Sequence, residues 1–87
     1  MARVIIPSPL RRYTNYRREI KIEASDLSTL MESLLASYQG LSIIREQPAL
    51  LSIFINGRLV KADEQSWNEI GLKEDDEISL IIPIAGG

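Results

Sequence analysis

One amphipathic segment limits the folds that are open to this chain. Its apolar side chains recur at intervals of three and four residues, at Leu27, Leu30, Met31, Leu34, Leu35 and Tyr38. Residues at this spacing share one face of an α-helix. Asp26 precedes the pattern as a candidate N-cap, and Gly40 follows it where a left-handed residue often ends a helix. A single apolar face must be covered, so we expect this helix to pack on a sheet.

Runs of residues typical of β-strands flank the predicted helix on both sides. These runs are residues 3–6, 19–23, 51–55, 58–60 and 77–82. Asn56-Gly57 separates the third run from the fourth, and this dipeptide is the strongest short signal of a type I′ hairpin. The order of elements is then β-β-α-β-β-β. It predicts an α+β domain, in which one main helix covers one face of a mixed sheet.

Three further segments connect these elements. Residues 10–18 are polar and turn-like, and residues 41–50 are expected to form an irregular connector. Residues 62–76 form a polar crossover to the last strand. The apolar side chains expected to close the open edge of the core from this crossover are Trp67, Ile70 and Leu72.

The composition excludes several classes of function. The chain has 87 residues, enough for one domain, and contains neither Cys nor His. It therefore lacks a disulfide framework, a thiol nucleophile and the commonest general base and metal ligand. The net charge of −2 and the absence of a long apolar run give no reason to expect nucleic acid binding or a membrane span. We expect a cytoplasmic protein that binds no metal and is not itself an enzyme.

The last five residues differ from the strand that precedes them. They are Pro83, Ile84, Ala85, Gly86 and Gly87. Pro83 cannot donate a hydrogen bond to a sheet, and the two glycines carry no side chain that would block a narrow channel. Fully extended, this segment spans roughly 16 Å at ~3.3 Å per residue. We expect residues 1–82 to form the folded domain and residues 83–87 to form a flexible tail that enters a partner protein.

Three segments resemble parts of the ubiquitin-like β-grasp family, and within it the small sulfur carriers. They are Leu10-Arg11-Arg12-Tyr13-Thr14-Asn15, Phe54-Ile55-Asn56-Gly57 and the stretch from Glu74 through Gly87. The first two are similar to the first-hairpin and central-hairpin segments of these carriers. The third is similar to their acidic turn, last strand and tail. The chain departs from the pattern at Tyr16, where many carriers have Gly, and at Glu74-Asp75-Asp76, where many have Asp-Gly-Asp.

The resemblance implies a function that depends on other proteins. An activating enzyme would use ATP with Mg²⁺ to adenylate the carboxylate of Gly87. With sulfur from a donor protein, the adenylate would then become a thiocarboxylate. An acceptor enzyme would take the sulfur for molybdopterin, cysteine or thiamine synthesis, or for tRNA thiolation. The carrier itself would supply no catalytic group.

Two other functions remain open. The chain could instead be a protein modifier that is joined through Gly87 to lysines of target proteins, alone or in addition to carrying sulfur. It could also be a non-covalent binding module. The terminal Gly-Gly favours a covalent function. Carrier and modifier are not separated, because both require the same adenylation.

The resemblance also predicts a docking surface. In a ubiquitin-like sheet, the last strand lies between the first and the third, and side chains alternate between the two faces of each strand. If the neighbouring apolar residues point to the helix, then Ile5, Phe54 and Ile81 point away from it. A contiguous exposed apolar patch usually marks an interaction site. We expect Ile5, Phe54 and Ile81 to bind the activating enzyme and the acceptor enzyme in turn.

Two charged segments have less specific interpretations. Residues 11–18 combine four arginines with two tyrosines. Such a mixture can bind nucleic acid, steer an acidic partner or lie in solvent; the net negative charge argues against nucleic acid. Glu74 to Glu77 are four consecutive carboxylates, which do not converge on one ion without other ligands and a glycine turn. We expect a solvated turn there and no metal site.

Overall fold

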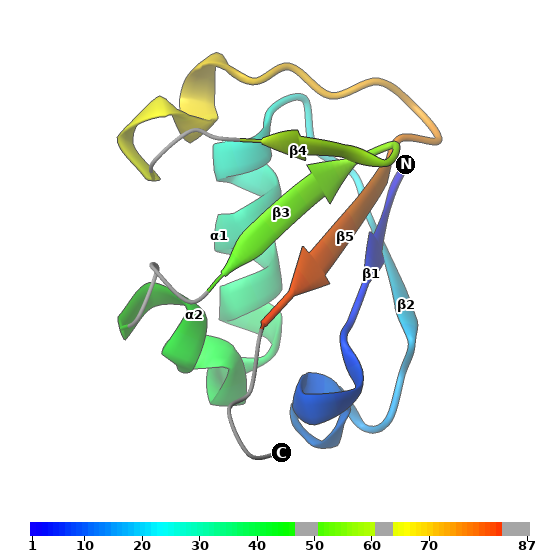
Figure 1. The fold of residues 1–87 in the computed structure, drawn as a ribbon, viewed down its shortest axis with the longest axis vertical. Helices are drawn as coiled ribbons and strands as arrows, with labels where there is room; N and C mark the ends of the chain where they lie inside the picture. The colour runs from blue at the N-terminus through cyan, green and yellow to red at the C-terminus, as the bar shows by residue number, and fades with distance from the viewer. Residues whose placement is uncertain (47–50, 61–63, 83–87) are drawn as a thin grey trace.

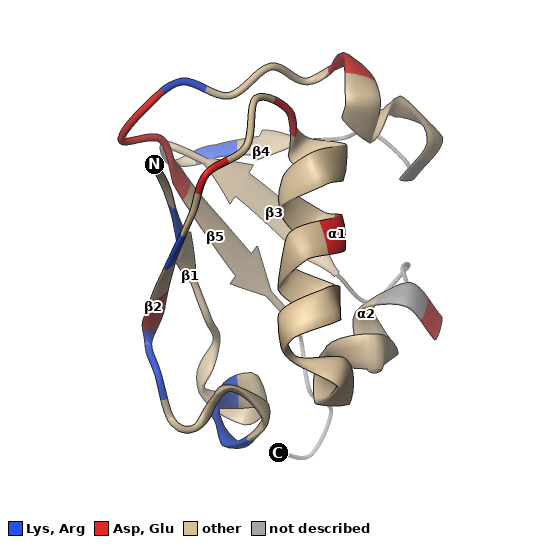
Figure 2. Ribbon diagram, turned by 180° about the vertical axis from the view of Figure 1, so that it is seen from behind, with Lys and Arg blue, Asp and Glu red and all other residues tan. Residues whose placement is uncertain are grey.

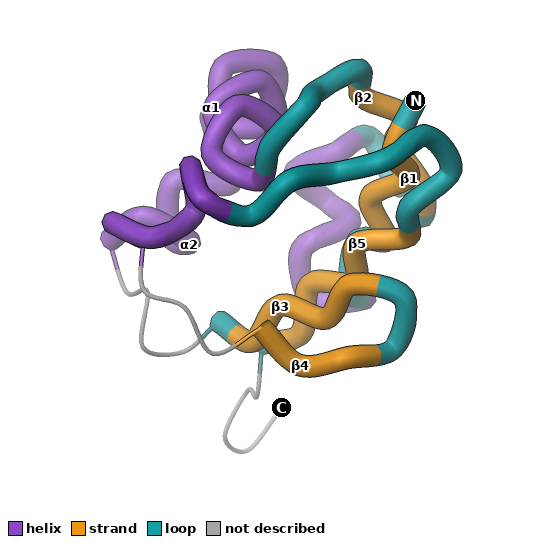
Figure 3. Tube along the Cα trace, turned by 90° about the horizontal axis from the view of Figure 1, so that it is seen from above, coloured by secondary structure: helices purple, strands orange, loops and turns teal. Residues whose placement is uncertain are grey.

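The computed structural model describes residues 1–46, 51–60 and 64–82, and it shows a five-stranded sheet with a helix on one face (Figures 1 and 3). The strands are β1 (Ala2–Ile5), β2 (Glu19–Ile22), β3 (Ser52–Ile55), β4 (Arg58–Val60) and β5 (Glu77–Ile81). The α-helices are α1 (Leu27–Ser37) and α2 (Ile43–Glu46), and the 3-10 helices are η1 (Ser8–Thr14), η2 (Gln39–Ser42) and η4 (Glu64–Glu69).

The sheet is mixed, and its last strand is central. The spatial order is β2-β1-β5-β3-β4, with β1 parallel to β5 and the other neighbours antiparallel. The predicted order of elements, the α+β class and the placement of the last strand between the first and the third are therefore confirmed. The end of β5 is thus positioned by a neighbouring strand on each side.

The amphipathic helix forms as its sequence pattern predicts. The carboxylate of Asp26 accepts a hydrogen bond from the backbone N–H of Thr29 at 2.7 Å, which satisfies one of the donors at the helix start. The fully buried side chains of the stripe are Leu27, Leu30, Met31 and Leu34. They pack against a core that includes Val4, Ile78 and Leu80 from the two central strands. Burial of this apolar area is the main force that holds helix and sheet together.

The prediction that Gly40 is a left-handed helix stop is wrong. The helix ends earlier, at Ser37, and Gly40 lies inside η2 without a positive φ. A side chain at Gly40 would place its Cβ only 2.6 Å from Cδ1 of Tyr13. Glycine at this position therefore allows the η1 and η2 segments to approach each other closely.

All three connectors contain more structure than the sequence predicts. Residues 8–14 form η1, with Pro9 in the first turn, where a missing backbone N–H costs little. The segment expected to be irregular after the helix contains η2 and α2, and it buries Leu41 and Ile44 in the core. In η4, Trp67 is buried, as predicted for a residue that closes the core. These short helices are held in place by single buried apolar side chains, which form no periodic pattern in the sequence.

A hydrogen-bonded clamp joins the central hairpin to the turn before β5. Asn56 and Gly57 have φ values of 51° and 84°, which confirms the positive φ expected at both turn positions. The Nδ2 group of Asn56 donates to Asp76 Oδ1 at 3.0 Å, and its Oδ1 accepts from the backbone N–H of Glu77 at 2.9 Å. Asp76 Oδ2 also accepts from the backbone N–H of Lys73 at 2.7 Å. The acidic turn is therefore partly structural, because Asp76 links two loops.

Replacing Asp76 by Ala is expected to lower the free energy of unfolding by about 1 kcal/mol near neutral pH, because two hydrogen bonds to a carboxylate are lost. The bond from Lys73, and then the bond from Asn56, hold the pKa of Asp76 below its ordinary value of 3.8. The stabilisation is thus fully present above that value and is lost as the pH falls through the lowered pKa. Thermal unfolding at several pH values should show the variant and the parent converging in acid. Glu74→Ala, at an exposed residue, is the control, and an equal loss there would contradict the clamp.

Candidate functional site

The candidate site lies at the end of the sheet where β5 finishes. Ile82 follows β5 and is still buried, with 9% of its surface exposed. The predicted tail, from Pro83 to Gly87, lies outside the described residues, so its role stays a prediction. The structure does place its point of departure. The tail follows the central strand, at the same end of the sheet where β1 leads into η1.

The sheet face opposite α1 carries apolar side chains on four strands. Ser79 of β5 pairs with Ile5 on one side and with Phe54 on the other. Phe54 pairs in turn with Leu59 of β4. Ile81 lies two residues further along β5, on the same face as Ser79 and nearer to the tail. We call Ile5, Phe54, Leu59 and Ile81 the sheet-face patch.

Exposure differs within the sheet-face patch. Ile81 is 47% exposed and Leu59 is 46% exposed, whereas Ile5 and Phe54 are half-buried. Ile5, Phe54 and Ile81 were expected to be neighbours across the sheet. The residue of β5 that lies between Ile5 and Phe54 is instead Ser79. Leu59 was not among the patch residues expected from the sequence. The two-residue turn at Asn56-Gly57 was the available signal, because such a turn pairs Phe54 with Leu59.

Charged side chains lie next to the patch, on β1, β2 and β5. Arg3 lies between two carboxylates, at 3.2 Å from Glu19 and 3.4 Å from Glu77. These side chains are more than a third exposed, so the ion pairs contribute little stability. They do mark a boundary, because Arg3 pairs with Glu77 at the start of β5. Apolar surface is therefore concentrated toward the end of the strand that precedes the tail.

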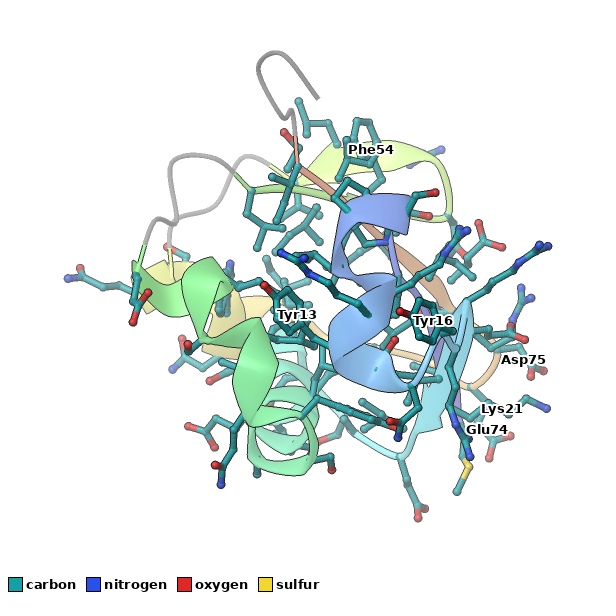
Figure 4. The ribbon with its side chains drawn as sticks, turned by 90° about the horizontal axis from the view of Figure 1, so that it is seen from below. Tyr13, Tyr16, Lys21, Phe54, Glu74 and Asp75 are labelled. Atoms are coloured by element: carbon teal, nitrogen blue, oxygen red, sulfur yellow. The ribbon has the colours of Figure 1, made fainter. Side chains whose placement is uncertain are left out.

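Four arginines flank the segment that holds Tyr13 and Tyr16, which Figure 4 labels, and this segment follows β1 at the same end of the sheet. We call Arg11, Arg12, Arg17 and Arg18 the arginine end. Arg11 donates from Nε to the backbone carbonyl of Ile6 at 3.0 Å. The guanidinium of Arg12 lies 4.9 Å from the centre of the Tyr13 ring and donates to its hydroxyl oxygen at 3.0 Å.

The turn between these arginines keeps a conformation that favours glycine. Asn15 and Tyr16 have φ values of 55° and 62°. Many similar carriers have Gly at the position of Tyr16, and the backbone here retains the left-handed conformation despite the bulky side chain. Asp75 behaves in the same way in the acidic turn, with φ of 66°. Both residues that stand where the resemblance would place Gly therefore adopt the backbone conformation that glycine favours.

Several kinds of site are not found in the part of the chain that the structure describes. Among residues 1–46, 51–60 and 64–82, no three Asp or Glu side chains are grouped so that they could hold a metal ion. Within the same ranges, no helix has the length and apolar character needed to cross a membrane.

Comparisons with known proteins agree with this geometry. The model of the ThiS family matches residues 4–87. No curated protein gave a significant sequence match. CysO of Mycobacterium tuberculosis is 19% identical with a TM-score of 0.79, covering 97% of this chain and 100% of its own. The small archaeal modifier protein 1 of Methanosarcina acetivorans is 23% identical with a TM-score of 0.78, covering 99% and 95%.

A third similar structure has higher identity and lower structural overlap. It is a chain of the protein–protein complex of subunits 1 and 2 of the molybdopterin-converting factor from Helicobacter pylori. Its identity is 26% and its TM-score is 0.64, with 99% of this chain and 97% of that chain covered. The family model extends over nearly the whole sequence, and the sheet order agrees with the similar structures. The chain therefore belongs to the ThiS family and is a ubiquitin-like β-grasp protein of the sulfur-carrier type.

Proposed function

We propose that this chain carries sulfur as a thiocarboxylate on Gly87. The observation that supports this most directly is the family match, which continues through the tail to Gly87. The fold adds a mechanical argument. The tail follows a central strand whose inward residues, Ile78 and Leu80, are almost completely buried. A firmly anchored strand fixes the base of the tail while its end reaches into a partner.

The proposed chemistry has two covalent steps. In the first, a carboxylate oxygen of Gly87 attacks the α-phosphorus of ATP, the bond to the β-phosphate breaks, and pyrophosphate leaves. Mg²⁺ in the partner would balance the charge of the phosphates. In the second, a sulfur nucleophile attacks the acyl carbon and AMP leaves. If the nucleophile is a persulfide of a donor protein, a thiol must then reduce the acyl disulfide to release the thiocarboxylate.

Partner proteins would supply the catalytic groups for both steps. The sequence contains no His, which is the commonest general base, and no Cys, which is the thiol nucleophile. What this chain contributes is a substrate carboxylate, a tail of defined length and a surface that positions the tail. It would thus act as a carrier and co-substrate in the reactions of an adenylating enzyme and an acceptor enzyme.

The sheet-face patch is our candidate for the surface that positions the tail. Ile81 lies one residue before Ile82 and close to the base of the tail, and it is 47% exposed on a strand whose Ile78 and Leu80 are buried. The similar H. pylori structure is a complex of two subunits, which supports the expectation that this chain also works bound to other proteins. The same patch would bind the activating enzyme first and the acceptor enzyme afterwards, since only one can receive the tail at a time.

A function as a protein modifier would use the same first step. The adenylate would pass, directly or through a thioester, to the Nζ atom of a lysine on a target protein and form an amide bond. The similarity to the archaeal modifier protein supports only the shared fold, because the identity is 23%. The two functions therefore differ in the nucleophile that receives the acyl group, which the partners determine.

The intact mass of the protein isolated from its native host tests the proposal. We expect a fraction whose mass shows one oxygen replaced by sulfur, located at the C-terminus by fragmentation. Gly-Gly remnants on lysines of other proteins would instead identify a modifier. If the cells are actively making sulfur-containing cofactors, finding only the unaltered mass and no Gly-Gly remnants would contradict both functions.

A further inference from the structure

We propose that the arginine end is a docking surface for an acidic protein surface surrounding the site that receives the tail. This inference rests on the proposed function, since it concerns the partner that activates Gly87. The recognised chemistry is a group of carboxylates at the mouth of the partner's tail channel. The sheet-face patch would supply apolar contact, and the arginine end would orient the approach.

The first support is position. β1 and β5 are parallel, with Ile5 level with Ser79, so both strands finish at the same end of the sheet. η1, which holds Arg11 and Arg12, begins only three residues after β1 ends. Arg17 and Arg18 directly precede Glu19, which pairs with Ile5. All four arginines therefore lie at the end of the sheet from which the tail departs.

The second support is the lack of acidic partners. Both ion pairs in the described part of the chain belong to Arg3. No described carboxylate lies within ion-pair distance of Arg11, Arg12, Arg17 or Arg18. The hydrogen bonds of Arg11 and Arg12 go to a neutral carbonyl and a neutral hydroxyl group. The positive charge of the arginine end is thus not neutralised by a described carboxylate, and it stays available to an acidic surface.

The third support is the fixed shape of the backbone that holds these arginines. Thr14 is completely buried, and its hydroxyl oxygen lies 3.1 and 3.0 Å from the carbonyl oxygens of Arg11 and Arg17. The backbone N–H of Tyr16 donates to the Arg11 carbonyl at 2.7 Å, and that of Arg17 donates to the Thr14 carbonyl at 3.0 Å. A surface held in this way loses less conformational entropy on binding than a mobile loop does.

The fourth support is the separation of charge along the molecule (Figure 2). The carboxylates of Glu74, Asp75, Asp76 and Glu77 lie at the start of β5, opposite the arginine end. With a net charge of only −2, total attraction to a partner is weak, and the arrangement of charge decides the orientation. An acidic partner would attract the end that carries the tail and repel the other end. Such steering raises association rates, often by one to three orders of magnitude.

The same observations favour a protein over a nucleic acid as the partner. Tyr13 is 37% exposed, but Arg12 lies over one face of its ring and the ring also lies close to Gly40, which limits the room for stacking a base. Tyr16, at 77%, is the more exposed of the two aromatic side chains of this loop. One well-exposed ring and a net negative charge make a weak site for RNA.

Two double variants of equal charge test the inference. The tail-end pair is Arg17→Glu with Arg18→Glu, and the far-end pair is Arg58→Glu with Lys73→Glu. Each changes the net charge by the same amount. Arg58 is level with Ile55 and Ile78, near the start of β5, and Lys73 adjoins the acidic turn. All four side chains are exposed, and circular dichroism checks that each variant folds.

The measurement is the association rate with the host's adenylating enzyme, without ATP, at low and high salt. We expect the tail-end pair to lower the rate about tenfold at low salt and the far-end pair to change it less than about twofold. The difference should vanish near 1 M salt, where the screening length is about 3 Å. If a Glu variant fails to fold, the corresponding Gln pairs replace it.

Each other outcome has a defined meaning. Equal effects of the two pairs would show that only net charge matters and would overturn the inference. The inference is also overturned if neither pair changes the association rate, or if the parent chain does not bind the adenylating enzyme. Loss of binding to host RNA by the tail-end pair, with binding to the enzyme unchanged, would overturn it as well. Pyrophosphate exchange, measured separately, tests the proposed function. Binding without exchange would reject adenylation of Gly87 and leave the docking result standing.

Discussion

Removing Gly87 is expected to abolish activation of the chain while leaving the fold unchanged. The deletion withdraws the terminal carboxylate by one residue, about 3.5 Å along an extended chain. A reacting group displaced by even 1 Å can lose about 10²-fold in rate, so we expect at least that loss in ATP–pyrophosphate exchange. Thermal unfolding should be unchanged, because the described core ends at Ile82.

Two matched variants separate the position of the carboxylate from the chemistry of the tail. Adding one glycine after Gly87 displaces the carboxylate by the same distance in the other direction and should be nearly as harmful. Ala85→Gly keeps the length and should retain activity within a few fold. Normal exchange by the deleted chain would show that Gly87 is not the activated residue and would reject both the carrier and the modifier function.

The local parts of this fold were predictable because their causes are local. The helix of residues 27–37 follows from spacing, and its start follows from the capping carboxylate of Asp26. The central hairpin follows from Asn56-Gly57, whose backbone adopts the positive φ values that a type I′ turn requires. The alternation of side chains between the two faces of each strand then predicted which apolar residues enter the core. Each of these features depends on residues within a few positions of one another.

The features that sequence reasoning missed depend on contacts between distant segments. Gly40 looked like a helix stop, yet its role is to accommodate the ring of Tyr13, 27 positions earlier. Asp76 looked like one charge in a solvated turn, yet it bonds to Asn56, 20 residues away in the chain. No periodic pattern encodes such pairs, because neither residue type is unusual in its own segment.

The topology of the sheet brings the arginines and the end of β5 together. In the sequence, Arg11 and Arg18 are far from Ile82, and their charge could be assigned to any partner or to solvent. The parallel pairing of β1 with β5 brings the two regions to the same end of the sheet. This pairing could be anticipated only through the family resemblance, since a parallel neighbour has no local signal. The sequence therefore indicated the residues of this end, and the fold supplied their relation to the tail.

Replacing Ile81 by Glu is expected to weaken binding to the activating enzyme by about 2 kcal/mol, roughly 30-fold in Kd. The side chain is 47% exposed, so the substitution should change the free energy of unfolding by no more than about 0.5 kcal/mol. In the complex, however, the carboxylate would be desolvated against apolar surface without a partner. Titration calorimetry measures the affinity, and thermal unfolding checks stability. Leu59→Glu, 46% exposed on the same face, should act in the same direction.

A control at the other face of the molecule makes this prediction specific. Ala36→Glu places the same charge at an exposed position of α1, on the far side of the sheet from the patch. It should leave the affinity unchanged, since that surface stays in solvent. Glu at residue 81 also adds negative charge near the arginine end, so measurements at high salt and Ile81→Ser separate charge from lost apolar contact. Ile81→Ser should retain most of the defect. Recovery of full affinity by that variant would mean that steering, and not apolar docking, explains the effect of Glu.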